Sequence, residues 1–382
     1  MRLPGTVVAL VAYALLTGGA GPAAATTAET DRLALPGVVV DSPAPLPEVT
    51  AEGWVLADLE TGEILAAANA HSVLRPASTL KVLTALAVLP ELEPDETYVA
   101  QWEDANAEGS RVGVVPDATY TVRNLLEALF LVSGNDAASA LANAAGGVDA
   151  TVTRMNQIAK ELGALDTYAV NPSGLDAPRQ RTSAYDLALI ARAALARADV
   201  RAYATTVKAQ FPGKMAKPGQ QRRTFEIHTQ NKLLLNYPGA IGLKTGWTTK
   251  ARGTFIGAAT RGDRTLVATV MRTEGDPWRE AQKLLRWGFR NAEAAQPVGA
   301  LGAVEPVAGV PAVNSDEDNT ATALAGSAGA GAGGSGLPWW LQVPLALAVV
   351  VALLRLRAVV RQRRRAVRRA QRARLLAARA RR

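Results

Sequence analysis

The sequence contains no cysteine. This absence excludes a disulfide framework, a thiol nucleophile and a zinc site with cysteine ligands. Histidine is almost absent too, because His71 and His228 are the only two in the chain. They lie far apart in the sequence, which argues against a zinc carboxypeptidase. The composition therefore favours a base other than histidine for any nucleophilic chemistry.

Acidic residues are missing from the end of the chain. Residues 355–382 contain 13 arginines and neither Asp nor Glu, while the whole chain has a formal net charge of +8. Without this tail and Arg2, the remaining chain carries −6. The pI of 9.9 therefore does not indicate a nucleic-acid-binding domain. Contact with anionic lipid is the simpler interpretation of the basic tail, and no nucleic-acid partner is expected.

Three short polar motifs are the most informative features that the chain does contain. They are Ser78-Thr79-Leu80-Lys81, Ser133-Gly134-Asn135 and Lys244-Thr245-Gly246. Each motif alone occurs by chance: a lone Ser78 is usually a helix cap, and a lone Lys81 usually lies on a solvated helix face. Their order matches a known nucleophile system in which lysine replaces histidine as the base. The ordered set therefore favours catalysis over a structural role.

The spacing of Ser78 and Lys81 suits a nucleophile and its base. Three residues apart on a helix, the two side chains lie on one face. Pro76 suits a first helical turn, where the helix dipole favours an attacking alkoxide. A serine hydroxyl needs an adjacent base, and lysine can serve only if burial or a second cation lowers its pKa. Lys244 is a candidate for that second cation.

The other two motifs offer groups that handle a proton and a substrate. Ser133 follows a helical pattern and is expected in a polar turn, where its hydroxyl could pass a proton to a leaving amine. Asn135 could hold Lys81 or a substrate amide. Lys244 and Thr245 are expected on a strand edge, where they could bind a carboxylate, while Gly246 would allow close backbone approach.

From about Glu52 to Phe289 the chain resembles the D-alanyl-D-alanine carboxypeptidases, the low-molecular-mass penicillin-binding proteins. Its middle motif has the Ser-Gly-Asn form that this family prefers, whereas class A β-lactamases usually carry Asp in the centre. The segment Asn-Pro-Ser-Gly-Leu-Asp at residues 171–176 is similar to a family segment that usually has His in place of Ser173. Further similar segments are residues 54–65, 75–81, 231–234 and 284–289.

The resemblance implies roles for the motif residues. Ser78 would be the acyl-enzyme nucleophile, Lys81 its base and Ser133 a proton relay. The substrate-binding residues would be Asn135, Lys244, Thr245 and Gly246. The reaction would remove the terminal D-Ala from peptidoglycan stem peptides, without a metal ion or organic cofactor, and β-lactam antibiotics would acylate the enzyme.

Several alternatives to this activity stay open. Endopeptidase or transpeptidase activity would differ only in the substrate or the acyl acceptor. A serine β-lactamase is the alternative among other enzymes. A catalytically silent scaffold of the cell envelope is the alternative outside enzymes, and the intact set of motifs argues against it.

Hydrophobic periodicity predicts an α/β fold of the α+β kind, in which helices flank an antiparallel sheet and form a helical subdomain. The family resemblance implies the DD-peptidase/β-lactamase-like version of this fold. Helices are expected at residues 78–89, 122–131, 137–145, 152–162, 183–198 and 277–289. A hairpin is expected at residues 56–65, and strands at residues 224–229, 253–260 and 266–272. The sheet must therefore combine segments from both ends of the domain.

The N-terminus has the features of a secretory signal at residues 1–25. Arg2 supplies the positive charge, residues 7–16 form the apolar core, and residues 23–25 are three alanines that suit a cleavage site. An uncleaved anchor is the alternative, but this apolar core is short for a membrane span. Residues 26–50 are expected to be an exposed leader, followed by a catalytic domain at residues 51–290.

The C-terminus predicts a membrane anchor. Residues 291–336 are rich in Ala, Gly, Pro and Val and are expected to be a flexible linker, where many family members instead continue into a small β-rich domain. An apolar run begins at Trp339 and spans about 22 residues, and a bilayer requires roughly 20. We expect a transmembrane helix at residues 337–360, a cytoplasmic tail at residues 361–382 and an extracytoplasmic catalytic domain. An amphipathic helix on the membrane surface is the alternative.

Overall fold

The computed structural model describes residues 32–216 and 220–302. All of these residues fall in one compact unit. The predicted signal peptide, transmembrane helix and basic tail lie outside the described residues. Within the part of the chain that is described, no helix combines the length and apolar character needed to span a bilayer.

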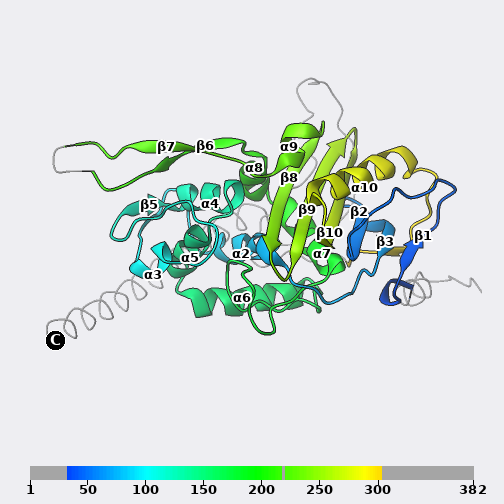
Figure 1. The fold of residues 1–382 in the computed structure, drawn as a ribbon, viewed down its shortest axis with the longest axis horizontal. Coiled ribbons are helices and arrows are strands. Elements are labelled where there is room, and N and C mark those ends of the chain that lie inside the picture. Colours follow the sequence, from blue (N-terminus) through cyan, green and yellow to red (C-terminus); the bar gives the residue numbers. More distant parts are fainter. Residues whose placement is uncertain (1–31, 217–219, 303–382) are drawn as a thin grey trace, which may run out of the picture. The chain divides into compact units, whose positions relative to one another are not determined.

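A seven-stranded sheet forms the centre of this unit (Figure 1). Its order is β1-β3-β2-β10-β9-β8, with β11 also paired to β3, and every pairing is antiparallel. The strands are β1 (Val38–Val40), β2 (Gly53–Asp58), β3 (Glu63–Ala68), β8 (Ala240–Thr248), β9 (Arg252–Arg261), β10 (Arg264–Thr273) and β11 (Gly299–Ala300). Val55 of β2 opposes Thr269 of β10, which confirms that the sheet joins distant segments.

Each face of the sheet packs against helices. Alternate residues of a strand point to opposite faces. In β2, Val55 belongs to the core that includes residues of α2 (Lys81–Val88) and α7 (Ala184–Leu195). The next residue, Leu56, belongs to the core with α10 (Pro277–Asn291). Because both faces are buried, β2 is a nearly continuous apolar run rather than an alternating one.

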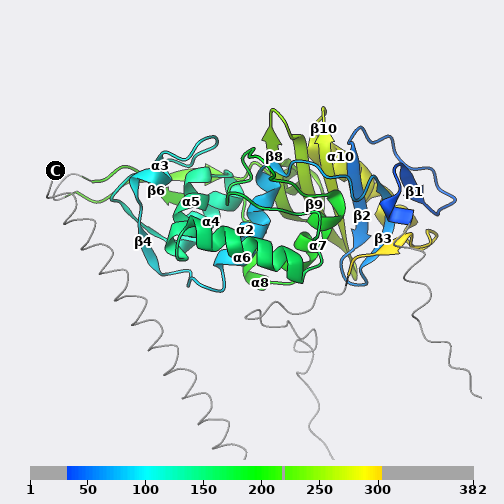
Figure 2. The same ribbon diagram turned by 90° about the horizontal axis from the view of Figure 1, so that it is seen from below.

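Most of the remaining helices gather at one end of this unit, beside α2 (Figure 2). They are α3 (Trp102–Ala105), α4 (Val122–Leu131), α5 (Asn135–Ala144) and α6 (Val148–Glu161), while α8 (Ala198–Thr205) and α9 (Lys232–Asn236) lie nearer the sheet. Helix α4 begins where the sequence predicts, because Thr121 and Asn124 cap it reciprocally. Two small antiparallel pairs complete the fold, β4 (Thr97–Val99) with β5 (Thr119–Thr121) and β6 (Lys208–Pro212) with β7 (Thr224–His228).

Two predicted helices are divided in the structure. The pattern at residues 78–89 becomes a 3-10 turn, η1 (Ala77–Leu80), followed by α2. The pattern at residues 183–198 ends with α7 at Leu195, and α8 begins separately at Ala198.

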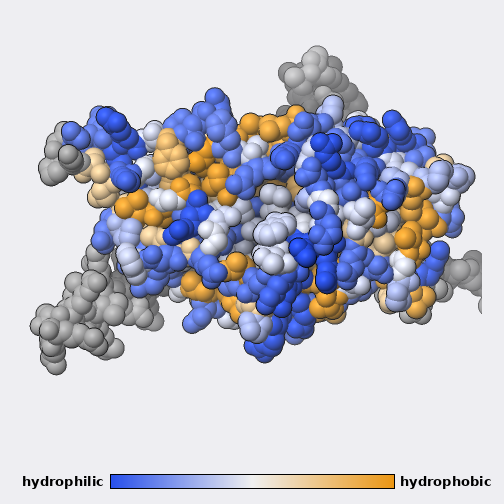
Figure 3. All heavy atoms as spheres, in the orientation of Figure 1, coloured by the Kyte–Doolittle hydropathy of each residue, from blue (hydrophilic) through white to orange (hydrophobic). Residues whose placement is uncertain are grey.

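The face seen in Figure 1 is largely hydrophilic with separate hydrophobic patches, as expected where most apolar side chains lie in the two cores (Figure 3).

The domain is longer than its predicted limits of residues 51–290. Part of the supposed leader at residues 26–50 belongs to the fold, because Leu33 is buried and β1 pairs with β3. Part of the supposed linker at residues 291–336 also belongs to it, because β11 pairs with β3 and Val298 is buried. The physical reason is that these short strands pair with backbone groups of β3 that would otherwise form an open sheet edge.

Candidate active site

Ser78 and Lys81 lie at the junction of η1 and α2. The Nζ atom of Lys81 is 2.9 Å from the Oγ atom of Ser78, within the range for direct proton transfer. Lys81 is completely buried, whereas Ser78 is partly exposed and accessible to a reactant. Ala77, just before Ser78, has a φ of +47°, a conformation that is unusual for a residue with a side chain.

The hydrogen-bond partners of Lys81 define how it can act. Its Nζ donates to Asn135 Oδ1 at 2.6 Å and to the carbonyl oxygen of Ser173 at 2.7 Å. Both of these oxygens can only accept. A neutral amine has two N–H groups and one lone pair, so two hydrogens can satisfy Asn135 and Ser173 while the lone pair faces the Ser78 hydroxyl. The arrangement therefore suits a neutral lysine that accepts the proton of Ser78.

A second serine–lysine pair faces the first. Ser133 lies in the turn between α4 and α5, and Lys244 lies on β8. Lys244 Nζ donates to Ser133 Oγ at 2.9 Å and to the carbonyl oxygen of Thr245 at 2.9 Å. Ser133 has a φ of +59°, a backbone conformation that is uncommon for residues other than glycine. This backbone conformation helps to set the direction of the Ser133 side chain. Thr245 is partly exposed on β8, the edge strand of the sheet, as the sequence predicts.

Burial sets the protonation of both lysines. Removal from water lowers the pKa of Lys244 to about 7. The pKa of Lys81 is also lowered well below its ordinary value, first by burial and second by the charge of Lys244. Asp136 acts in the opposite direction on the pKa of Lys81, and burial outweighs it. Lys244 thus has the effect on Lys81 that the sequence suggested for a second cation.

Gly246 lies close to the segment that carries Ser78. A Cβ atom at this position would lie 2.5 Å from Thr254 Oγ1, 2.8 Å from the backbone nitrogen of Ser78 and 3.0 Å from the Cβ of Ala77. This glycine therefore allows a close approach between β8 and the segment around Ser78. Without it, the sheet edge could not pack against η1 at the present distance.

Asn135 is held by a loop that sequence reasoning missed. Its side chain donates to the carbonyl oxygen of Glu108 at 2.5 Å, and its backbone N–H donates to the carbonyl oxygen of Ser110 at 2.7 Å. The neighbouring Asp136 accepts hydrogen bonds from the backbone N–H groups of residues 112–114. These contacts use backbone groups, which every residue carries, so no side-chain pattern identifies them.

The sequence also indicated only indirectly that Lys81 contacts the Ser173 carbonyl. The preceding Asn171 accepts hydrogen bonds from the backbone nitrogens of Ser173 and Gly174 and shapes the turn. Gly174 has a φ of +81°, and an added Cβ would collide with the carbonyl oxygen of Ala77. The family-like segment at residues 171–176 was therefore the sequence signal for this turn. It did not indicate that the Ser173 carbonyl accepts a hydrogen bond from Lys81.

Comparison with known proteins shows the family of the chain. A family model described as D-alanyl-D-alanine carboxypeptidase matches residues 39–275. The chain is 45% identical over 267 residues to the D-alanyl-D-alanine carboxypeptidase DacB2 of Mycobacterium tuberculosis, covering 68% of this chain and 88% of that protein.

Solved structures agree as well. A D-alanyl-D-alanine carboxypeptidase of M. tuberculosis is 44% identical with a TM-score of 0.64, covering 69% of this chain and 100% of that one. The Streptomyces K15 DD-transpeptidase is 29% identical with a TM-score of 0.61, covering 65% and 100% respectively. With its three motifs assembled around Ser78, this chain belongs to the D-alanyl-D-alanine carboxypeptidase family.

Proposed function

We propose that the protein is a serine-type D-alanyl-D-alanine carboxypeptidase that removes the terminal D-Ala from peptidoglycan stem peptides. One observation carries this proposal: the amine of Lys81 is buried, has a lowered pKa and lies 2.9 Å from the hydroxyl of Ser78. The family relationship supplies the substrate class and the sensitivity to β-lactams. A β-lactamase or a silent scaffold is not favoured.

In the proposed acylation step, neutral Lys81 takes the hydroxyl proton of Ser78. Ser78 Oγ attacks the carbonyl carbon of the penultimate D-Ala, and the peptide bond to the terminal D-Ala breaks. The leaving amine takes the hydroxyl proton of Ser133, which hydrogen-bonds to Lys244. The proton that Lys81 removed from Ser78 replaces it on Ser133, so Lys81 is neutral again before hydrolysis. Water then hydrolyses the ester on Ser78 and regenerates the enzyme.

Lys244 and Thr245 are the proposed binding groups for the terminal carboxylate of the substrate. Thr245 lies on the edge strand, where its partly exposed side chain can reach a peptide laid beside β8. Lys244 contributes positive charge when it is protonated. Transpeptidation, the activity named for the Streptomyces K15 relative, would require only an amine in place of the hydrolytic water.

The activity is tested by the substitution Ser78→Ala. We expect this variant to release no D-Ala from a model peptide ending in D-Ala-D-Ala and to form no covalent adduct with fluorescent penicillin, because no acyl-enzyme can form. Wild-type protein should label and retain the label, whereas a β-lactamase would lose it rapidly. Covalent labelling of Ser78→Ala would contradict the assignment of the nucleophile.

For the location of the enzyme, we propose a single membrane crossing with the catalytic domain outside. The proposal rests on the sequence of residues 337–382, where Trp339 and Trp340 open the apolar run and the tail that follows contains arginine without any acidic residue. Removal of the predicted signal at residues 1–25 would leave this segment as the anchor. The substrate is cell-wall peptide, so this location would place the active site on the side where the wall is built.

A further inference from the structure

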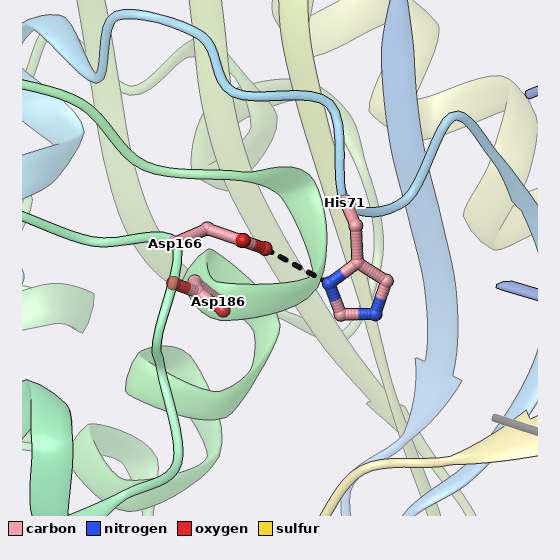
Figure 4. Close-up of side chains that lie close together, drawn as sticks. All are labelled: His71, Asp166 and Asp186. Carbon is pink, nitrogen blue, oxygen red and sulfur yellow. Dashed lines mark hydrogen bonds and ion pairs between the residues drawn. The ribbon is translucent and has the colours of Figure 1, made fainter. Parts of the chain in front are cut away.

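A second cluster of reactive side chains contains none of the residues of the serine–lysine pairs (Figure 4). His71 comes from the turn after β3, Asp166 from the loop between α6 and α7, and Asp186 from the first turn of α7. One ligand atom from each residue lies within 4.8 Å of the other two. The Nδ1 atom of His71 is 2.8 Å from Asp166 Oδ2. Three separate segments therefore converge on one point.

We propose that His71, Asp166 and Asp186 form a binding site for a divalent transition-metal ion, with Zn²⁺ as the best match. One imidazole nitrogen and two carboxylate oxygens are typical zinc ligands, and a water molecule would complete a tetrahedron. Mg²⁺ and Ca²⁺ prefer oxygen ligands alone, so the histidine selects against them. Bond lengths of about 2.0–2.1 Å would place donors about 3.3 Å apart, so His71 and Asp166, now 2.8 Å apart, would separate by about 0.5 Å. Because all donors lie within 4.8 Å of one another, the more distant ones would approach by at most about 1.5 Å.

The surroundings of the cluster hold its ligands in place. Thr167 Oγ1 donates to Asp186 Oδ2 at 2.7 Å and also contacts Thr182 Oγ1 at 2.8 Å. The ring of His71 packs against Tyr185, with centroids 4.4 Å apart. Such outer contacts orient ligands and strengthen metal binding. Asp186 is almost fully buried, whereas the other two ligands are partly exposed, which provides an entry path for an ion.

The other histidine of the chain provides a natural comparison. His228 lies 3.0 Å from Glu226 on β7, so it also pairs with a carboxylate. Its side chain is 65% exposed, however, and in the described part of the chain it belongs to no group of three potential ligands. His228 therefore represents an ordinary surface ion pair, and it should not hold zinc at the affinity of a built site.

The proposed ion would connect the two segments that build the active site. The chain from His71 leads to Ser78, and the loop that carries Asp166 leads to Ser173, whose carbonyl accepts from Lys81. Leu74 and Thr182 already join these segments through two backbone hydrogen bonds of 2.8 Å. Zinc would add a third connection without taking part in the chemistry at Ser78, so the inference does not depend on the proposed activity.

The test uses the full-length chain without a histidine tag, dialysed metal-free and then against zinc. We expect one zinc ion per chain by elemental analysis and a higher melting temperature with zinc than without it. His71→Gln and Asp166→Asn should weaken zinc binding on the order of 100-fold, while the matched control His228→Gln should bind like the wild type. Failure of the wild type to bind zinc, or unchanged binding by His71→Gln, would overturn the proposal.

A second measurement needs no variant and therefore no assumption about variant folding. X-ray absorption at the zinc edge of the wild-type protein should show one imidazole with oxygen ligands in the remaining positions. A coordination shell of oxygen alone, or one with two imidazoles, would overturn the assignment of this cluster. The circular dichroism spectrum of each metal-free variant, compared with that of the metal-free wild type, checks that its fold is intact.

Discussion

At the scale of single residues, the central feature is a pair of buried lysines in one site. Burying an ammonium group is unfavourable, and two such groups repel each other. The structure responds by lowering the pKa of both, to about 7 for Lys244 and well below the ordinary value for Lys81. Burial of these lysines disfavours their charged forms, and this same effect makes a neutral amine available near neutral pH.

The effect of Lys244 on Lys81 can be measured with the substitution Lys244→Met. Loss of the nearby cation removes a repulsion that disfavours protonated Lys81, so the pKa of Lys81 rises. Acylation needs neutral Lys81, and the rising limb of the pH–acylation profile should therefore move to higher pH. Lys244→Arg retains the charge and should leave the position of the limb near that of the wild type. A Lys244→Met profile that coincides with the wild type would refute the coupling.

A second residue-level prediction concerns Lys81→Arg. Arginine keeps the positive charge but does not lose its proton in a protein, so it cannot accept one from Ser78. We expect the rate of penicillin acylation to fall by on the order of 10² or more. The exposed Lys160, at the end of α6, allows a matched Lys160→Arg control that should acylate normally. Near-normal acylation by Lys81→Arg would mean that another group is the base.

At the scale of structural elements, the site depends on tight packing between segments with unusual backbone conformations. Ala77 and Ser133 both have positive φ angles, and they lie on the two segments that present the hydroxyl groups. Gly174 and Gly246 allow the neighbouring loop and strand to approach the segment around Ser78. Side-chain positions at the site are thus determined largely by how closely three backbone segments meet.

The packing at Gly174 is tested by comparing Gly174→Ala with Gly163→Ala. Both glycines have positive φ, +81° and +75°, so both substitutions carry a backbone strain of about 1–2 kcal/mol. Only at Gly174 does the added methyl collide with the chain before Ser78, which should cost about 1–3 kcal/mol more. We expect Gly174→Ala to melt at a lower temperature and to label slowly with penicillin. Equal behaviour of the two variants would show that the collision relaxes freely.

At the scale of the whole molecule, the proposal is a folded catalytic domain tethered to a membrane. The described domain continues to Gly302, since Leu301 is buried and Arg192 donates hydrogen bonds to the carbonyl oxygens of both residues. A tether would therefore begin after Gly302, later than the sequence-based limit at residue 290. The shorter tether still leaves residues 303–336 between the domain and the proposed span.

Membrane topology is tested by adding protease to intact spheroplasts. We expect release of a soluble fragment that binds penicillin and ends between residues 303 and 336, because the tail is shielded inside while the tether is exposed outside. After detergent permeabilisation, the arginine tail should also be digested. If the tail is digested in intact spheroplasts, or if salt removes the full-length protein, the surface-helix alternative replaces the transmembrane one.

The sequence by itself was sufficient to single out three motifs as the candidate site and to predict the local elements around them. The Ser78 and Lys81 spacing, the order of the three motifs, helix α4 and the β2–β3 hairpin all depend on neighbours within a few residues, and short-range periodicity and turn residues report such interactions well. The segment at residues 171–176 was visible as a family segment, although its contact with Lys81 was not.

The tertiary structure alone decided which distant groups meet. The contact of Lys81 with the Ser173 carbonyl, the pairing of β1 and β11 with β3, and the convergence of Asp166 and Asp186 on His71 join segments far apart in the chain. Backbone carbonyls and strands of two or three residues leave no periodic pattern in a sequence. Their partners depend on how the whole chain packs, because an open strand edge or a buried amine is satisfied by whichever group the fold brings within hydrogen-bonding distance.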